Sequence, residues 1–277
     1  MSKRTLTTAV AVAAIVASGS ASALTVTTTN DATVLTNTLL GSGVTTSNLS
    51  YTGAAVASGT FTDGLSSGIG MDSGILLTSG AATNAVGPNT VPDITTDNGL
   101  GGDADLTSLI PGYSTYDATV LEFDFTTSSN DIFFNFAFGS DEYNEYVGTQ
   151  YNDVFGFFLD GVNIALIPGT STAVSINNVN NGANSAYYND NESGAYNLQY
   201  DGFTDVFTAS ALGLSAGPHH IKLAIADAGD HYLDSGVFLQ AGTFGSKPPT
   251  VPEPGSLALM GLGLVGLAAV GRRNRNR

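Results

Sequence analysis

The apolar runs of this chain are short, and Gly, Asn, Asp or Pro residues bound almost all of them. From Val120 to Phe125 acidic residues alternate with aromatic ones, which is the two-residue period of a half-buried strand. Asp160-Gly161 stands between two apolar runs and predicts a two-residue hairpin turn. Strands are expected at residues 44–51, 75–78, 119–125, 131–138, 154–160, 162–167, 173–179, 219–226 and 236–244. Many short strands separated by turns predict an all-β fold, either a β-sandwich or a jelly roll.

One short helix is expected before the first of these strands. Asn30 can cap it, Val34, Leu35 and Leu39 share one face, and Gly41 can end it. The sequence therefore predicts a short N-terminal helix on an otherwise all-β domain.

Two further segments are long and polar. Residues 87–112 and 180–194 are poor in aliphatic residues and rich in Asn, Asp and Gly. Structureless loops of this length in a compact β domain are usually functional or ordered by ions. We therefore expect long loops at both places and look for function in or near them.

The N-terminus has the pattern of a secretory signal peptide. Lys3 and Arg4 precede a mostly apolar stretch, and Ala21-Ser22-Ala23 offers the small residues that a signal peptidase reads. Residues 1–23 are therefore predicted to be a signal peptide, with Ala21 and Ala23 at the cleavage site. Signal peptidase is the first partner that the sequence implies.

The C-terminus has three parts in a fixed order. Val251-Pro252-Glu253-Pro254 is followed by 17 uncharged residues, 255–271, and then by an arginine-rich end, 272–277. An apolar run of 17 residues is at the lower limit for a transmembrane helix, and the arginines would keep the end cytoplasmic. The alternative is an ordinary single-pass tail anchor.

This three-part ending resembles the PEP-CTERM sorting signal of Gram-negative bacteria, which an exosortase recognises and cleaves. The resemblance implies an exported protein whose precursor is anchored in the inner membrane. After processing, such a protein is expected at the cell surface or in the extracellular matrix.

Charge and cysteine content restrict what lies between the two signals. Six of the 8 basic residues belong to the signals, so only Lys222 and Lys247 remain to balance 24 acidic residues. The segment between the signals therefore has a net charge of about −22. Such a surface repels phosphate backbones, which excludes nucleic acid as a partner, and attracts cations. Solubility outside the cell explains the charge equally well. Because the chain has no cysteine, its stability must come from the core, from bound ions or from partners.

The segment between the signals reads as one domain, residues 24–246, followed by a linker that contains the Pro-Glu-Pro motif, residues 247–254. Its most distinctive motifs are Phe138-Gly139-Ser140-Asp141-Glu142-Tyr143-Asn144-Glu145-Tyr146, residues 152–158, 163–170, 175–180, Tyr200-Asp201-Gly202-Phe203-Thr204 and residues 225–230. These motifs resemble the choice-of-anchor L domain over nearly the whole segment. The resemblance implies an exported β-sandwich module, lectin-like in shape, that is fused to different surface anchors and has no established enzymatic activity.

Two acidic clusters are candidate metal ligands. Ca²⁺ takes six to eight oxygen ligands, usually from loops. The candidates are Asp141, Glu142, Asn152 and Asp153 in the first cluster, and Asp227, Asp230 and Asp234 in the second. The first set converges if the loop after residue 141 folds back on the following strand. The alternative is that these side chains cap turns and otherwise face water.

Tyrosines in and around these clusters are candidate ligand-binding residues. Tyr143 and Tyr146, if exposed, suit stacking on sugar rings, and so do Tyr187, Tyr188 and Tyr232. The alternative is that they are half-buried strand residues.

These observations favour a structural or adhesive binding module of the surface or matrix, with extracellular polysaccharide or a surface protein as its partner. The alternative is a hydrolase that acts on matrix polysaccharide through paired carboxylates. Gly-x-Ser-x-Gly occurs at residues 64–68 and 213–217, but neither copy lies between a strand and a helix as a nucleophile elbow requires. We therefore expect no enzymatic activity.

Overall fold

The computed structural model describes residues 23–249. Ala21, the sorting motif from Val251 to Pro254, the apolar segment 255–271 and the basic end 272–277 lie outside the described residues. None of the helices within residues 23–249 has the length and apolar character that a membrane crossing requires.

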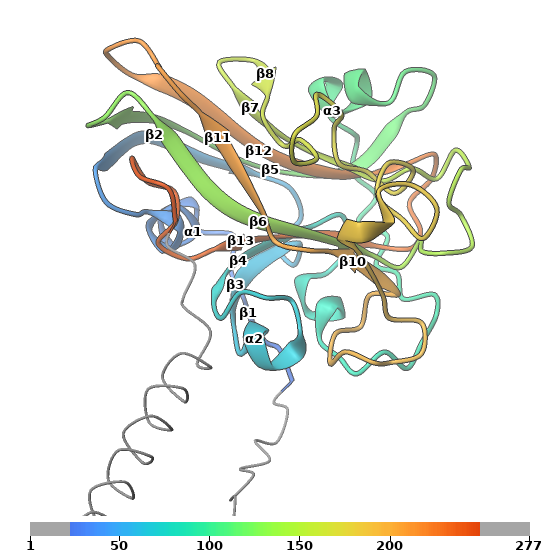
Figure 1. Ribbon diagram of the computed structural model, residues 1–277. Helices are drawn as coiled ribbons and strands as arrows, with labels where there is room; N and C mark the ends of the chain where they lie inside the picture. The colour runs from blue at the N-terminus through green and yellow to red at the C-terminus, as the bar shows by residue number, and fades with distance from the viewer. Residues whose placement is uncertain (1–22, 250–277) are drawn as a thin grey trace, which may run out of the picture.

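Two antiparallel sheets pack face to face, so the predicted all-β sandwich is confirmed (Figure 1). The eight-stranded sheet has the order β1 (Thr25–Thr28), β3 (Ser58–Thr62), β4 (Gly74–Thr78), β13 (Ser235–Gln240), β6 (Ile132–Ser140), β10 (Gly202–Thr204) and β9 (Tyr188–Asp190), with β11 (Phe207–Ala211) also paired to β6. The five-stranded sheet has the order β2 (Val44–Thr52), β5 (Thr115–Thr127), β12 (His219–Ala228), β7 (Val154–Leu159) and β8 (Val162–Asn163).

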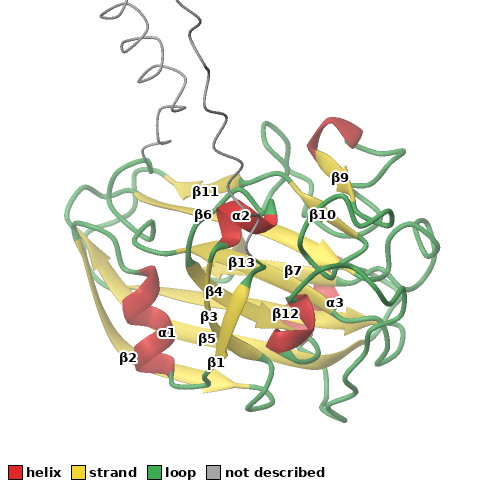
Figure 2. Ribbon diagram, turned by 90° about the horizontal axis from the view of Figure 1, so that it is seen from below, coloured by secondary structure: helices red, strands yellow, loops and turns green. Residues whose placement is uncertain are grey.

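The helices are short: one contacts strands of both sheets, and another packs on the outer face of the five-stranded sheet (Figure 2). They are α1 (Ala32–Leu39), α2 (Gly64–Ser67), α3 (Ala104–Leu109) and the 3₁₀ turns η1 (Ala82–Ala85) and η2 (Ser185–Tyr187). The predicted N-terminal helix is α1, but its cap is Asp31 rather than Asn30. The Asp31 Oδ1 accepts from the backbone N–H of Thr33 at 2.8 Å, while Leu35 and Leu39 are buried in the core.

Six predicted strands match observed ones, and three predictions need correction. Residues 173–179 are not a strand, because the Ser175 carbonyl accepts from the backbone N–H groups of Asn178 and Val179 in a turn. The strand predicted at 162–167 ends at Asn163, whose Oδ1 accepts from Phe157 and Ala165 at 3.0 Å each. The last predicted strand ends at Gln240 rather than at residue 244. Short strands rich in Ser, Thr, Gly or polar residues, namely β1, β3, β9, β10 and β11, had not been predicted.

Aromatic side chains from both sheets form the core. Phe136 of β6 lies at the centre, with its ring 5.0 Å from that of Phe157, 5.4 Å from Phe155 and 5.7 Å from Phe207. β6 and β11 belong to one sheet and β7 to the other, so these contacts join the two layers. In a chain without disulfides, this aromatic packing is the main source of tertiary stability.

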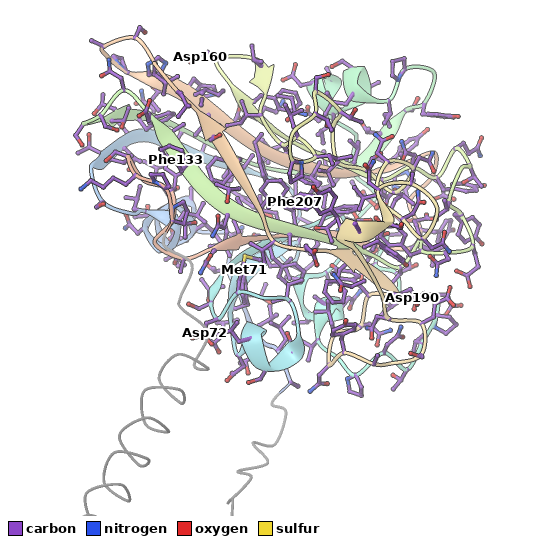
Figure 3. All side chains as sticks on the ribbon, in the orientation of Figure 1. Met71, Asp72, Phe133, Asp160, Asp190 and Phe207 are labelled. Carbon is purple, nitrogen blue, oxygen red and sulfur yellow. The ribbon has the colours of Figure 1, made fainter. Side chains whose placement is uncertain are left out.

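Phe136→Ala should lower the free energy of unfolding by about 3–5 kcal/mol, because it leaves a large cavity between the sheets. Phe133, on the same strand, is only half-buried, so Phe133→Ala is the matched control and should cost less than about 2 kcal/mol (both Phe133 and Phe207 are labelled in Figure 3). Urea unfolding of the two variants measures the difference. Equal losses would mean that the core does not lie where the structure puts it.

A histidine ties β12 to the predicted Asp160-Gly161 hairpin turn, which is present with φ of +47° and +84°. His219 Nδ1 lies 2.6 Å from Asp160 Oδ2, and Nε2 lies 2.9 Å from the Ser215 carbonyl. Both ring nitrogens therefore face acceptors, and only the protonated imidazole can donate to both. The bond with Asp160 and then that with Ser215 raise the pKa of His219.

Because the pKa of His219 is raised in the folded state, its contribution is fully present below about pH 6.5 and is lost as the pH rises through the folded pKa. His219→Gln should therefore cost more stability at pH 5.5 than at pH 8.5, by about 1 kcal/mol since Asp160 is half exposed. Urea unfolding at the two pH values checks this. An equal loss at both would mean that His219 stays neutral.

Candidate functional site

One end of the sandwich gathers buried acidic side chains. β6 and β12 run toward this end, and β5, β7, β10 and β13 start from it. Seven carboxylic side chains there are at most 3% exposed: Asp117, Asp141, Glu142, Asp153, Asp201, Asp227 and Asp234. We call this the acidic end. It lies on the right in Figure 1, where the long loops also gather.

Strand register brings these residues together. Ser140, the last residue of β6, lies opposite Ser235 of β13 and Gly202 of β10. The acids next to these positions are Asp141, Asp234 and Asp201, and we call them the Asp141 group. In the other sheet, Ala226 lies opposite Val154, so Asp227 and Asp153 are close, and Glu142 interacts with Asp153. We call Glu142, Asp153 and Asp227 the Asp153 group.

Two of the three members of the Asp141 group, Asp141 and Asp201, have carboxylate oxygens without a hydrogen-bond donor. Asp234 is satisfied, since its Oδ1 accepts from Thr96 N–H at 3.0 Å and its Oδ2 from Asn84 Nδ2 at 2.9 Å. Asp201 accepts one bond, from Asn89 Nδ2 to Oδ1, and its Oδ2 has no partner. Neither oxygen of Asp141 has a partner of ordinary hydrogen-bond geometry, and neither does the buried Tyr200 hydroxyl beside this group.

Burial and mutual repulsion make ionisation of these groups costly. Burial raises the pKa of Asp141 well above its usual value, and the negative charges of Asp201 and Asp234 raise it further. The backbone N–H of Asp201 lowers the pKa of Asp141 by a smaller amount. Burial raises the pKa of Asp201 to about 6, and burial also raises the pKa of Asp234. A bound cation would reverse this effect, because it favours the charged carboxylates.

The Asp153 group also has buried carboxylate oxygens without hydrogen-bond partners, but none of its members lines the surface depression that lies next to the Asp141 group. Asp153 accepts from Ala228 N–H at 2.8 Å and from the Ser235 hydroxyl at 2.6 Å, whereas both oxygens of Asp227 and the Oε2 of Glu142 have no partner. Burial raises the pKa of Asp153 to about 7 and that of Glu142 to about 10, and burial and then the charge of Asp153 raise the pKa of Asp227 strongly.

Asp117 belongs to neither group, because both of its carboxylate oxygens accept hydrogen bonds from a histidine and from loop backbone N–H groups. Its Oδ2 accepts from His231 Nδ1 at 2.9 Å and from Asn98 N–H at 3.1 Å, and its Oδ1 accepts from Leu100 N–H at 2.5 Å. Asp97, Asp117 and His231 have ligand atoms within 4.8 Å of one another, which a metal ion would require. These hydrogen bonds already give Asp117 its partners, so the trio holds the 97–100 loop in place.

A surface depression opens next to the Asp141 group. Residues 89–92, Glu145, Glu192 and Asp201 line it, and its volume is about 270 Å³. Asn144 fixes one wall, since its Nδ2 donates to Glu192 Oε1 at 2.9 Å. Three carboxylates therefore face this space, and no basic residue does so among the described residues that line it.

The predicted metal ligands separate into two kinds. Asp141, Glu142, Asp153, Asp227 and Asp234 are buried at the acidic end. The other two accept backbone hydrogen bonds. Asp230 caps a turn, as the alternative predicted, by accepting from Tyr232 N–H at 3.0 Å. Asn152 is buried instead, and its Oδ1 accepts from Asn177 N–H at 2.8 Å, which joins two loops.

Two members of the acidic end, Asp117 and Asp201, were not among the predicted ligands. Neither has another acidic residue within three positions on either side. The signal that could have found Asp201 is its place within Tyr200-Asp201-Gly202-Phe203-Thr204, one of the distinctive motifs of the chain.

The prediction that Tyr143 is exposed is wrong. It is fully buried, its hydroxyl donates to the Val179 carbonyl at 2.6 Å, and its ring centroid lies 4.8 Å from that of Tyr188. Tyr143 follows Glu142 directly, and its ring is covered by Tyr188 of β9 and lies next to Gly202 of β10. Tyr146 is 36% exposed and Tyr232 is 58% exposed, so these two can contact a ligand.

Tyr143→Ala should lower the free energy of unfolding by about 3–5 kcal/mol, since it removes a buried ring and a buried hydrogen bond. Tyr146→Ala, three residues away at the surface, should change it by less than about 1 kcal/mol. Thermal unfolding of both variants gives the comparison. A loss of less than about 1 kcal/mol in Tyr143→Ala would mean that Tyr143 lies at the surface after all.

Comparison with known proteins gives two matches. The family model described as Choice-of-anchor L domain matches residues 23–245, and that described as PEP-CTERM protein-sorting motif matches residues 250–274. No curated protein and no solved structure matches the chain.

Proposed function

The chain belongs to the choice-of-anchor L domain family, and we propose that its β-sandwich is an adhesive and structural module that binds extracellular polysaccharide. Its PEP-CTERM motif makes it an exported protein that an exosortase processes at the membrane of a Gram-negative bacterium on its way to the surface.

The observation that carries the proposal is the position of the acidic end relative to the sorting motif. The last part of the domain is fixed at the opposite end of the sandwich, where Gly245 pairs with Phe133 near the start of β6 and Ser246 N–H donates to the Ser42 carbonyl at 3.0 Å. The sorting motif begins at residue 250. The long loops of the acidic end therefore point away from the side at which the chain continues toward its anchor (Figure 1).

The surface of these loops has the chemistry of a carbohydrate contact. Tyr146 packs edge-on against Tyr151, whose ring lies against Gly229, so the loop with Tyr146 and the loop with Tyr232 are neighbours. Aromatic rings can stack on the apolar faces of sugars, and the neighbouring Asn and Asp side chains can bond to hydroxyl groups. The negative charge favours a neutral or cationic polymer over an acidic one.

A hydrolase is the second candidate, and one observation favours it. Asp201 has a pKa of about 6, raised by burial, and shares the depression with Glu145 and Glu192, which is a pattern that glycosidases use. Against it, Glu142 and Asp153 lie beneath the surface and do not line the depression.

The mature protein, purified from an exporting host, should co-sediment with isolated extracellular polysaccharide. Tyr146→Ala combined with Tyr232→Ala should weaken this binding about tenfold, because two stacking surfaces are lost. Leu212→Ala is the control, since Leu212 is 68% exposed and follows β11 at the opposite end of the sandwich.

Mature wild-type protein that stays in the supernatant would overturn the adhesive role. Release of reducing sugar ends that Asp201→Asn abolishes would establish the hydrolase instead. If the double tyrosine variant binds as well as wild type, the contact lies elsewhere on the sandwich.

A further inference from the structure

Among the buried acids, Asp201 of the Asp141 group combines an unpartnered oxygen with a place in the wall of the surface depression. Asp141 is 1% exposed, and although the backbone N–H of Asp201 acts on its carboxylate, neither oxygen accepts a hydrogen bond of ordinary geometry; Oδ2 of Asp201 has no partner either. Leaving a buried acceptor unpaired costs about 1–3 kcal/mol, and more for a charged group. A domain that keeps three such oxygens in one group of neighbouring strand ends is expected to satisfy them with something other than protein.

Asp201 provides the route to solvent, because it belongs to this group and also lines the surface depression. No member of the Asp153 group lines it. A small solute that enters the depression therefore reaches Asp201, and Asp141 lies behind Asp201 rather than in the wall of the depression.

The depression has no cationic side chain of its own among its described lining residues. Lys222 is held elsewhere, with its Nζ 2.8 Å from Asp105 and also paired with Asp103. Lys247 follows Ser246 at the opposite end. The carboxylates of Glu145, Glu192 and Asp201 thus face one another without a counter-charge from a lysine or arginine.

We propose that a calcium ion binds at the base of this depression, between Asp141 and Asp201, with Glu145 and Glu192 at its mouth. Ca²⁺ accepts six to eight oxygen ligands in flexible geometry, and carboxylates with the carbonyls of residues 89–92 supply oxygens of that kind. Mg²⁺ suits the site less well, since it requires a nearly regular octahedron and gives up water reluctantly. This site does not depend on the adhesive role.

The first test is calcium binding to the mature wild-type protein, stripped with EDTA, by isothermal titration calorimetry and by thermal unfolding. A site with a dissociation constant near 10 μM should raise the melting temperature by about 5–10 °C in 1 mM Ca²⁺ relative to EDTA. Mg²⁺ at the same concentration should have a smaller effect. No heat of binding and no shift in the wild-type protein would overturn the proposal.

Isosteric variants then locate the ion. Asp141→Asn and Asp201→Asn should each abolish most of the calcium-dependent shift. In EDTA, Asp141→Asn should melt above wild type, because one repelling charge is gone and the new amide can donate to neighbouring carboxylates. A merely structural Asp141 predicts the opposite result in EDTA. Asp72→Asn is the control and should leave the calcium-dependent shift unchanged, because Asp72 is exposed and lies away from the acidic end. Figure 3 labels Asp72 and also Asp190, which marks the acidic end.

The Asp153 group offers the decisive alternative. If Asp227→Asn abolishes the shift while Asp141→Asn and Asp201→Asn keep it, the ion binds in that group and the assignment is wrong. If calcium has no effect and lowering the pH alone stabilises the protein, protons rather than a metal ion neutralise the buried acids.

Discussion

Repulsion between carboxylates buried at one end of the two sheets is the constraint on which the rest of this structure depends. Asp141, Asp201 and Asp234 meet at the ends of adjacent strands, and Asp153 and Asp227 meet in the opposite sheet. Each of these groups loses its hydration on folding, and only some of the lost hydrogen bonds are replaced. The cost falls when protons or a cation neutralise the charges, so the stability of the fold is coupled to its ionic surroundings.

The aromatic core provides the opposing stabilisation. Phe136, Phe155 and Phe157 pack across the gap between the sheets, and Phe244, from the last turn of the domain, joins Phe123 and Phe134. This core sits between the two ends of the sandwich and holds the strand ends in register. The acidic side chains are therefore held at fixed positions in spite of their repulsion, which is the preorganisation that a binding site requires.

The two ends of the sandwich differ in what they carry. The chain continues to its sorting motif from the end at which Ser246 bonds to Ser42, and the long loops with Tyr146 and Tyr232 lie at the other end. The long polar loops and the point at which the chain continues to its sorting motif therefore lie at opposite ends of the sandwich. Adhesion at the loops and a calcium ion beneath them would then be separate properties of one end, since the exposed tyrosines and the unpartnered carboxylates are different residues.

Sequence alone determined the features that depend on local order: the export signals as patterns, the alternation that makes β5 a strand, the turn at Asp160-Gly161 and the all-β class. It also pointed to the acidic segments at 141–153 and 227–234. It failed where local patterns compete with tertiary contacts. Tyr143 resembled a surface residue but is buried, and residues 173–179 have the composition of a strand but fold as a turn whose backbone groups satisfy one another. Only the tertiary structure decided that Asp201 joins Asp141, because their contact follows from the pairing of β6 with β10, which are some 60 residues apart in sequence and whose register no local pattern encodes.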